Sequence, residues 1–392
     1  MALPRSAAVS SSADGTLRIW DLDAWACCGV LAGHREAVSA LSVDFPARRA
    51  VSGAHDCVLR VWDLEACSCL GTLEGHLDWV QAVSADFRAQ RALSGSCDRT
   101  VRLWDLQAMK CSASLGGHRA WVMSVSADFA RQRAASGASD GEIRTWDLRA
   151  LACLGVLGKH GLCVFAVSAD FERQLAMSGS ADGSLRVWDL AEMAPLGNLS
   201  LGGKQRSCVM AVSVDFGARR AVSSNQAGGV HVWDLEGMRL LGSLEGHKKG
   251  VTAVTADFSE WRAISGSDDN TLLVWDLREM ACVGSLQGHS SVVHGVAFAL
   301  GSDAPGCGLC LQRLKHRPLT CIITVMVGVV AALVSVRGTL TSLRILGFPA
   351  VCLDTPEAVG NCQAQSLLGE FVSRIASSWL LSCGRQSHRA HH

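Results

Sequence analysis

The sequence lacks net charge, tyrosine and any nucleotide-binding signature. Its 36 basic and 36 acidic residues cancel, so no bulk field recruits nucleic acid or an anionic membrane, and such a contact would need a local patch. There is no glycine-rich phosphate loop and no basic stripe interleaved with aromatics, which leaves nucleotide hydrolysis and nucleic-acid binding without support. The absence of tyrosine carries no functional information. Hydrophobic residues make up 49% of the 392 residues and charged residues 18%, which excludes a disordered chain.

A secretory signal and a disulfide framework are also missing. Residues 1–20 contain no apolar run of the kind that directs secretion, and the 17 cysteines are odd in number and unevenly spaced. Both features favour free thiols in a reducing compartment. We therefore expect a cytoplasmic protein.

What the sequence does contain is a repeat built on tryptophan. Seven of its 12 tryptophans are followed by aspartate, at successive spacings of 42, 42, 42, 42, 45 and 42 residues. The pairs are Trp20-Asp21, Trp62-Asp63, Trp104-Asp105, Trp146-Asp147, Trp188-Asp189, Trp233-Asp234 and Trp275-Asp276. A fixed period of this size is typical of repeat architectures in which each unit leaves an apolar face that only its neighbour covers.

Each period reads as four short strands separated by turn residues. In one unit the strands are Val80–Ser84, Arg91–Ser94, Thr100–Trp104 and Cys111–Leu115. With a Gly-His pair near the start of the unit and an aspartate six residues before Trp-Asp, the pattern resembles the WD-repeat β-propeller family over about residues 1 to 300. The resemblance implies an all-β ring of four-stranded antiparallel blades around a central channel, used as a scaffold for protein partners.

The two ends of the repeat region predict how the ring closes. Ala7–Ser11, Thr16–Asp21 and Cys27–Leu31 supply three strands of a blade with no innermost strand before them. Val292–Phe298, after the last Trp-Asp unit, reads as an innermost strand without companions. One strand plus three completes a blade, so we predict a propeller of seven blades over residues 1–300, closed by hydrogen bonds between its two ends.

Polar residues recur at constant offsets in each unit. These types could form a hydrolase triad, but an active site needs to occur once, whereas the set repeats around the ring. The resemblance implies instead a buried network that links strand to turn in each blade. The predicted sets are His34, Ser52, Asp56, Trp62; His76, Ser94, Asp98, Trp104; His118, Ser136, Asp140, Trp146; His160, Ser178, Asp182, Trp188; His247, Ser265, Asp269, Trp275; and, across the closure, His289 with Ser10, Asp14 and Trp20.

One unit departs from this pattern. Before Trp233-Asp234 the histidine position holds Gln205 and the aspartate position holds Ala227. Joint loss of two partners avoids leaving one of them buried and unsatisfied, so the departure supports a bonded network. The same unit carries the three-residue insertion near 201–206, and we predict that this blade is the least rigid. Its loop, with Lys204 and Arg206, is either a contact point or a plain surface loop.

A second signature is Asp-Phe eighteen residues before the tryptophan in six of the seven Trp-Asp units, from Asp44-Phe45 to Asp257-Phe258. An arginine follows the aspartate five residues later in most units, and Leu175 is the exception. We predict a turn staple in which aspartate and arginine face each other over a packed phenylalanine. A composite binding face made by this ring of charges is the alternative.

The partner site is expected where the repeat varies. Three residues after the Gly-His histidine, two successive units carry tryptophan, and aromatic anchors are typical of binding hot spots. The predicted partner-binding residues are Trp79, Trp121, Arg119, Asp78 and Arg35, together with His55 and Asp268, which immediately precede network aspartates and should line the same face. The alternative is that both tryptophans only cap blade interfaces. No cofactor is expected.

Two units read Trp-Asp-Leu-Arg, ending in Arg149 and Arg278. This is similar to a short motif in WD-repeat substrate receptors of cullin-type ubiquitin ligases, where the arginine contacts the adaptor. The third residue after tryptophan is often charged or polar in any such repeat, so the ligase receptor is an alternative to a general scaffold.

From residue 301 to 392 the period stops. Residues 319–336 carry no charge over eighteen positions, and a helix of that length, about 27 Å at about 1.5 Å per residue, is close to a bilayer core. Basic residues on both sides weakly favour a cytoplasmic propeller. The alternatives are a segment packed on the propeller or an unfolded tail.

Two further features lie in the same region. Apolar residues at three- and four-residue steps predict an amphipathic helix over 364–381. Cys307, Cys310 and His316 are not followed by a second ligand pair at zinc-finger spacing, so we predict no metal site.

Overall fold

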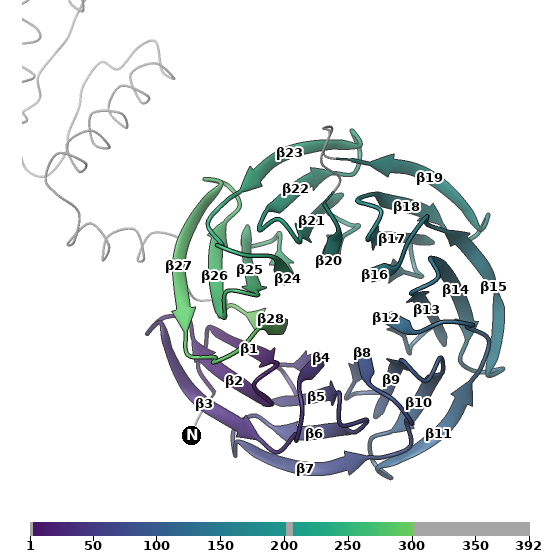
Figure 1. The fold of residues 1–392 in the computed structure, drawn as a ribbon, viewed down its shortest axis with the longest axis horizontal. Coiled ribbons are helices and arrows are strands. Elements are labelled where there is room, and N and C mark those ends of the chain that lie inside the picture. Colours follow the sequence, from purple (N-terminus) through teal and green to yellow (C-terminus); the bar gives the residue numbers. More distant parts are fainter. Residues whose placement is uncertain (1–2, 201–206, 302–392) are drawn as a thin grey trace, which may run out of the picture. The chain divides into compact units, whose positions relative to one another are not determined.

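A computed structural model describes residues 3–200 and 207–301. Over these ranges every regular element is a β-strand, and the 28 strands form seven four-stranded antiparallel sheets arranged as a ring (Figure 1). The apolar segment 319–336, the helix predicted over 364–381 and the loop with Lys204 and Arg206 lie outside the described residues. Within 3–200 and 207–301, no helix of the length and apolarity needed to span a bilayer occurs.

We number the sheets as blades 1 to 7 in chain order, with the closing sheet as blade 1. The strands are, in blade 1, β28 Val293–Ala299, β1 Ala7–Ser12, β2 Thr16–Asp21 and β3 Ala26–Ala32; in blade 2, β4 Val38–Asp44, β5 Arg49–Ala54, β6 Leu59–Asp63 and β7 Ser68–Leu73; in blade 3, β8 Val80–Asp86, β9 Arg91–Ser96, β10 Val101–Asp105 and β11 Lys110–Leu115; in blade 4, β12 Val122–Asp128, β13 Arg133–Ala138, β14 Glu142–Asp147 and β15 Ala152–Lys159; in blade 5, β16 Val164–Asp170, β17 Leu175–Ser180, β18 Leu185–Asp189 and β19 Ala194–Leu199; in blade 6, β20 Val209–Asp215, β21 Arg220–Asn225, β22 Val230–Asp234 and β23 Arg239–Leu244; and in blade 7, β24 Val251–Asp257, β25 Arg262–Ser267, β26 Thr271–Asp276 and β27 Ala281–Gln287.

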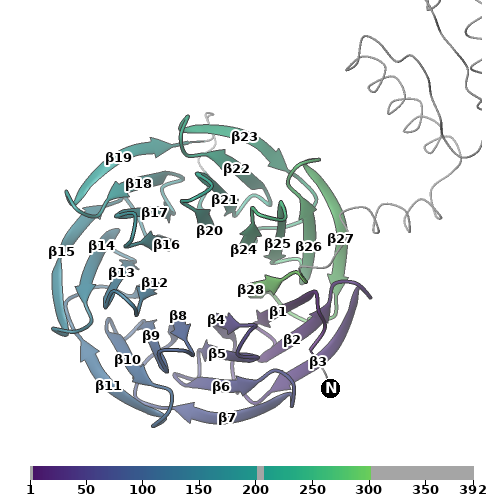
Figure 2. The ribbon, with the colours of Figure 1, turned by 180° about the vertical axis from the view of Figure 1, so that it is seen from behind.

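The prediction of closure between the two ends of the repeat region is confirmed. The sheet order in blade 1 is β28-β1-β2-β3, and the register of β1 with β28 runs from Ala7 opposite Ala299 to Ser12 opposite Val293 (Figure 2). The innermost strand begins one residue later than the sequence predicts, at Val293. The ring is thus joined by a ladder of backbone hydrogen bonds, which leaves no open sheet at the junction.

The core of the molecule lies between the blades. Trp104 of blade 3 is fully buried, in one cluster with Val51 and Leu73 of blade 2 and with Phe87 of its own blade. The second strand of each blade is buried along almost all of its length, because a neighbouring blade covers each of its faces. The apolar area that stabilises one blade is therefore supplied by the next one, as expected of a repeat fold.

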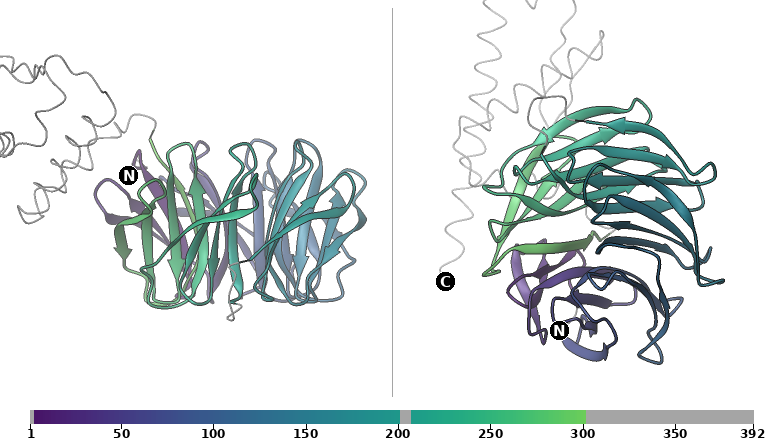
Figure 3. Two further views of the ribbon diagram at one scale, coloured as in Figure 1. Left: turned by 90° about the horizontal axis from the view of Figure 1, so that it is seen from above. Right: turned by 45° about the vertical axis from the view of Figure 1, so that its right-hand side comes forward.

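The disc has two faces that carry different segments (Figure 3). The network face holds the loops from each outer strand to the next innermost strand, such as 74–79, and the turns between second and third strands, such as 97–100. The turn face holds the other two turns of each blade, such as 87–90 and 106–109. This division follows from antiparallel pairing within a blade and decides which variable residues meet.

Candidate functional site

Blade 3 shows the buried network in its complete form. Trp104 Nε1 donates to Ser94 Oγ at 2.7 Å, and the same hydroxyl lies 2.7 Å from His76 Nε2. His76 Nδ1 lies 2.6 Å from Asp98 Oδ2, and Asp98 Oδ1 accepts the Thr100 N–H at 2.9 Å. The chain of bonds runs from the third strand to the second, then to the incoming loop and the turn, so it fixes the network face of the blade.

Blades 1, 2, 5 and 7 repeat this chain of bonds. In blade 1 it crosses the closure as predicted, because His289 lies 2.7 Å from Ser10 and 2.9 Å from Asp14. Burial alone would raise the pKa of Asp14, but hydrogen bonds from Thr16 and His289 outweigh it and lower the pKa to about 2. The bonded sets are His34, Ser52, Asp56, Trp62; His160, Ser178, Asp182, Trp188; and His247, Ser265, Asp269, Trp275.

The network serines are not placed as nucleophiles. Ser94 is fully buried, and its hydroxyl bonds both Trp104 and His76. Serines 10, 52, 136, 178 and 265 are equally buried and bonded in the same way. A nucleophile must reach a substrate carbonyl, so these sets act as structure.

Blade 4 forms only half of the predicted network. Trp146 Nε1 donates to Ser136 Oγ at 2.8 Å, and Ser136 lies 2.7 Å from His118 Nε2. His118 Nδ1 is buried without a hydrogen-bond partner, and Asp140 does not reach it. The expected bond between Asp140 and His118 is therefore wrong for this blade.

Blade 6 uses other residues in place of the missing pair. Ser223 still accepts from Trp233 Nε1 at 2.8 Å, while Gln205 lies outside the described residues. Asn225 Oδ1 accepts the N–H groups of Ala227 and Gly229, at 3.0 and 2.9 Å, and Asn225 Nδ2 lies 2.9 Å from His231 Nε2. This substitute was not predicted from the sequence. The signal for it is a polar pair, Asn225 and His231, at positions where other units carry serine or alanine and arginine or leucine.

Exposed apolar side chains gather on the network face of blades 3 to 5. Trp79 is 46% exposed, Trp121 54% and Leu77 85%, and Leu162 on the next loop is also exposed. We call Leu77, Trp79, Trp121 and Leu162 the apolar arc. All four belong to loops that lead into an innermost strand, so they point away from the buried core of their blades. The sequence predicted the tryptophans and missed both leucines.

Trp79 meets a second predicted residue across a blade boundary. Its ring stacks on His55 of blade 2, with ring centroids 4.1 Å apart and planes 5° apart. Burial lowers the pKa of His55, which keeps the imidazole neutral against the indole at neutral pH. Asp78 Oδ1 accepts the Trp79 N–H at 2.8 Å and orders the loop. Trp79 is therefore held in place on one face while its other surface stays open, which prepares it for contact at little entropic cost.

Backbone hydrogen bonds pair the two sets of variable positions, which the sequence predicted only to line the same face. The N–H of the residue before the network aspartate donates to the carbonyl of the residue three after the histidine: His55 to Ala37 at 2.9 Å, and Ser139 to Trp121 at 2.8 Å. Asp268 and Gly250 form the same pair in blade 7, at 2.9 Å. Both sets therefore lie together on the network face, around the mouth of the channel.

His294 is a residue of this mouth that the sequence analysis missed. It is the second residue of the innermost strand β28, and burial followed by the nearby charge of His55 lowers its pKa, while Asp268 opposes the shift. His55, His294 and Asp268 thus belong to one region of blades 2, 1 and 7. The second residue of the innermost strand varies from unit to unit, and comparing that position could have found it.

Arg35 and Arg119 are exposed on the same face, but the other predicted arginines lie elsewhere. Arg149 and Arg278 are exposed on the turn face, where the Arg278 guanidinium lies 5.9 Å from the centre of the Trp261 ring.

Among the described residues no group of three or more histidine, cysteine or acidic side chains could hold a metal ion, and Cys307, Cys310 and His316 lie outside them.

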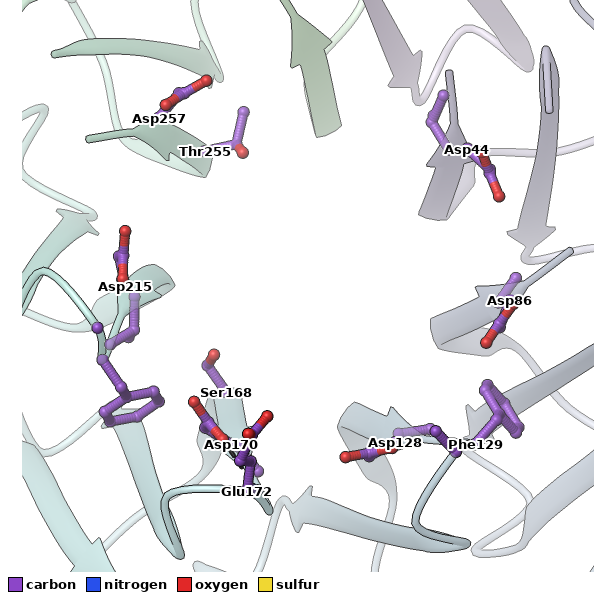
Figure 4. A pocket seen from close by; sticks show the side chains of 18 of the residues that line it. Asp44, Asp86, Asp128, Phe129, Ser168, Asp170, Glu172, Asp215, Thr255 and Asp257 are labelled. Carbon is purple, nitrogen blue, oxygen red and sulfur yellow. Dashed lines mark hydrogen bonds between the residues drawn. The ribbon is translucent and has the colours of Figure 1, made fainter. Parts of the chain in front are cut away.

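The Asp-Phe signature forms the turn-face end of the channel. A cavity of about 1000 Å³ is lined there by one aspartate from each of six blades and by Ala299 in blade 1, and the six aspartates surround the opening (Figure 4). Asp86 Oδ1 accepts the N–H groups of Arg88 and Ala89, at 2.8 and 2.9 Å. The aspartates therefore cap their own turns, and the phenylalanines pack beneath. A composite binding face here stays a prediction.

The predicted ion pair of the turn staple is wrong. Arg133 pairs in register with both Asp128 and Asp147, but its guanidinium bonds Asp147 of the Trp-Asp pair, at 2.6 Å. Arg220 and Arg262 likewise form ion pairs with Asp234 and Asp276. Asp128 Oδ2 is occupied by Arg131 of its own turn, at 3.2 Å. The arginine thus ties the second strand to the third rather than closing the first hairpin.

Comparisons with known proteins agree with this geometry. The family profile described as WD domain, G-beta repeat, matches residues 4–21, 25–63, 67–105, 109–147, 151–189 and 238–276, and passes over blade 6, in which the network is replaced. The crystal structure of the computationally designed Ika8 protein is similar at 30% identity, with a TM-score of 0.59, over 74% of this chain and 87% of that one. No curated protein matches the chain.

Proposed function

The chain belongs to the WD40-repeat family, and from that premise we propose that it is a non-catalytic scaffold that binds a protein or peptide on its network face. The observation that carries the proposal is the apolar arc: two tryptophans and two leucines, exposed on successive loops of one face. Exposed aromatic clusters rimmed by polar groups are typical of protein-binding surfaces. Arg119 and Asp78 supply the polar rim, and the stack of Trp79 on His55 holds one anchor ready.

The test compares two pairs of exposed residues in the full chain. Proximity labelling should identify partners of the wild type that a Trp79→Ser, Trp121→Ser variant loses by about tenfold or more, as expected for hot-spot residues. The matched control is Leu154→Ser, Leu196→Ser, which removes equally exposed apolar side chains from the outer strands. Equal labelling by both variants would place the partner site elsewhere.

A receptor role in a cullin-type ubiquitin ligase rests on Arg149 and Arg278 alone. An Arg149→Ala, Arg278→Ala variant should then lose the adaptor in a pull-down with an unchanged thermal midpoint, since both side chains are exposed. Retained adaptor would count against this role.

We further propose that the propeller lies in the cytoplasm and is tethered to a membrane through residues 319–336. The support is the uncharged stretch and its basic flanks. Fractionation of the full chain beside a version ending at Leu300 tests this. The full chain should enter the membrane pellet and the shortened chain should not; a shortened chain in the pellet would refute the tether.

A further inference from the structure

In five blades the network aspartate accepts two hydrogen bonds from the loop that carries the histidine. In blade 3, Asp98 Oδ2 accepts from His76 Nδ1 at 2.6 Å and from the Leu77 N–H at 3.1 Å. Blades 1, 2, 5 and 7 have the same pair of bonds, to Asp14, Asp56, Asp182 and Asp269. The loop therefore presents a two-donor site for one carboxylate oxygen.

In blade 4 this two-donor site is not filled by the protein's own carboxylate. His118 is 7% exposed, and its Nδ1 has no hydrogen-bond partner. Asp140 accepts the Glu142 N–H at 3.1 Å, but it accepts neither His118 Nδ1 nor the Arg119 N–H.

The residue two positions after the aspartate explains why Asp140 stays away. In blade 3 the Thr100 hydroxyl donates to Asp98 Oδ1 at 2.6 Å, and a hydroxyl does the same in blades 1, 5 and 7. Blade 4 has Glu142 at this position, bonded to Arg144 at 2.9 Å. Blade 2 has Val58 at this position and its Asp56 still docks, so a missing hydroxyl alone does not keep the aspartate away. An ionised Glu142 also repels a second carboxylate beside it, so the docked position of Asp140 is disfavoured.

The unfilled nitrogen is a donor. Ser136 Oγ accepts from Trp146 Nε1, so its own proton points to His118 Nε2, 2.7 Å away. The proton of the neutral imidazole then lies on Nδ1. Burial and then the charge of Arg144 lower the pKa of His118 to about 4, against the charges of Asp140 and Glu142, so the imidazole is neutral at neutral pH. An acceptor is what the site lacks.

We propose that the His118–Trp121 loop of blade 4 binds a side-chain carboxylate of the protein partner. The carboxylate takes the place that Asp98 Oδ2 takes in blade 3, and it accepts from His118 Nδ1 and the Arg119 N–H. In the five complete blades the aspartate at this place keeps 6–14% of its side chain exposed, whereas in blade 4 His118 Nδ1 is itself buried, so the side chains of the neighbouring turn have to move aside when the carboxylate binds. The exposed Arg119 guanidinium attracts the partner's carboxylate by its positive charge. The exposed Trp121 ring packs against an apolar residue next to that acidic residue of the partner. This inference rests on the proposed function and names the chemistry of its partner.

The test uses the full chain, labelled with ¹⁵N-histidine, and two small probes. One is aspartate capped as N-acetyl and N-methylamide, and the other is asparagine capped in the same way. Capped aspartate should shift the His118 Nδ1 resonance in a saturable way, with capped asparagine at least about tenfold weaker, because charge-assisted bonds are about twice as strong as neutral ones. Equal binding of both probes, or no saturable shift, would overturn the proposal.

Variants of blade 4 sharpen the test. Glu142→Thr restores the hydroxyl and should let Asp140 dock, which lowers the affinity for capped aspartate about tenfold or more; Glu142→Ser serves if that variant does not fold. Asp140→Ala removes the internal competitor and should bind at least as well as the wild type. Val58→Thr in blade 2, where Asp56 already docks, is the control and should change nothing. Unchanged binding by Glu142→Thr would contradict the proposal, whereas partner loss in the Trp79, Trp121 variant tests only the proposed function.

Discussion

Blades 3 and 6 have the same strand arrangement, but different polar residues form their buried networks. In blade 3 a histidine from the incoming loop and an aspartate in the turn complete the network around Ser94. In blade 6 Asn225 caps the turn, and its Nδ2 donates a hydrogen bond to His231 Nε2 of the neighbouring strand. His231 Nδ1 in turn lies 2.8 Å from Ser243 Oγ of the outer strand. The two blades share the bond from tryptophan to serine and differ in everything around it.

The difference shows that satisfaction of buried groups matters more than their identity. A buried donor or acceptor without a partner costs about 1–3 kcal/mol, whereas exchanging one satisfied set for another costs little. Blade 6 therefore tolerates Ala227 because Asn225 accepts the Gly229 N–H, the turn donor that the aspartate accepts in other blades, as Asp98 accepts the Thr100 N–H. The family profile, which follows residue types, passes over this blade, although its strands and register match those of the others.

The largest expected effect breaks the feature that both blades share. Trp104→Ala and Trp233→Ala should each lower the free energy of unfolding by about 3–5 kcal/mol, since both indoles are buried between blades. Urea unfolding followed by circular dichroism measures this. The control is Trp121→Ala on the apolar arc, which should change stability by under about 0.5 kcal/mol. If Trp233→Ala lowered the free energy of unfolding much less than Trp104→Ala, the buried tryptophan of blade 6 would contribute less to stability than that of blade 3.

The next effect concerns the buried histidines that differ between blades. Burial lowers the pKa of His231 in blade 6 to about 4, from 6.5 in the unfolded chain. Between these values the unfolded state binds more protons, so the free energy of unfolding falls as pH drops from about 6.5 toward 4, by up to about 3 kcal/mol for this group.

Urea unfolding of the wild type and of His231→Gln at a series of pH values measures this loss. Between about pH 6.5 and 4, the free energy of unfolding of the variant should fall less than that of the wild type. The difference should equal the contribution of His231. Parallel pH profiles for the two proteins would contradict the prediction.

Much of the fold follows from the sequence because the signals are local and repeated. The strand count at the two ends predicts that β28 completes blade 1, and the constant offsets predict the bond from His289 to Ser10. Period and offset are sufficient here, because every blade places the same position at the same point in space.

The sequence predicts less where a residue has a choice of neighbours. Arg133 lies in register with two aspartates, and spacing cannot tell which of them its guanidinium bonds. The stack of His55 on Trp79 crosses a blade boundary, so it depends on the angle between blades. The unpaired Nδ1 of His118 depends on the orientation of Asp140, which lies two residues before Glu142.

A smaller effect removes the aspartate that blade 6 does without. Asp98→Ala should lower the free energy of unfolding by about 1–3 kcal/mol, because His76 Nδ1 and the turn N–H of Thr100 lose their acceptor. Asn225→Ala in blade 6 should cost a similar amount, since it leaves the turn N–H groups and His231 without partners. Urea unfolding midpoints compare the two variants. An Asn225→Ala protein as stable as the wild type would show that the substitute network contributes nothing.

The smallest effect is expected where the aspartate is present but not engaged. Asp140→Ala in blade 4 should change the free energy of unfolding by under about 0.5 kcal/mol, because Asp140 makes no bond to His118 and accepts only the Glu142 N–H. The same substitution at Asp98 removes two acceptors and serves as the matched comparison. Parallel urea titrations of Asp98→Ala and Asp140→Ala measure the contrast. If Asp140→Ala destabilised the protein as much as Asp98→Ala, Asp140 would have to dock on His118 in solution, and blade 4 would hold its own carboxylate like its neighbours.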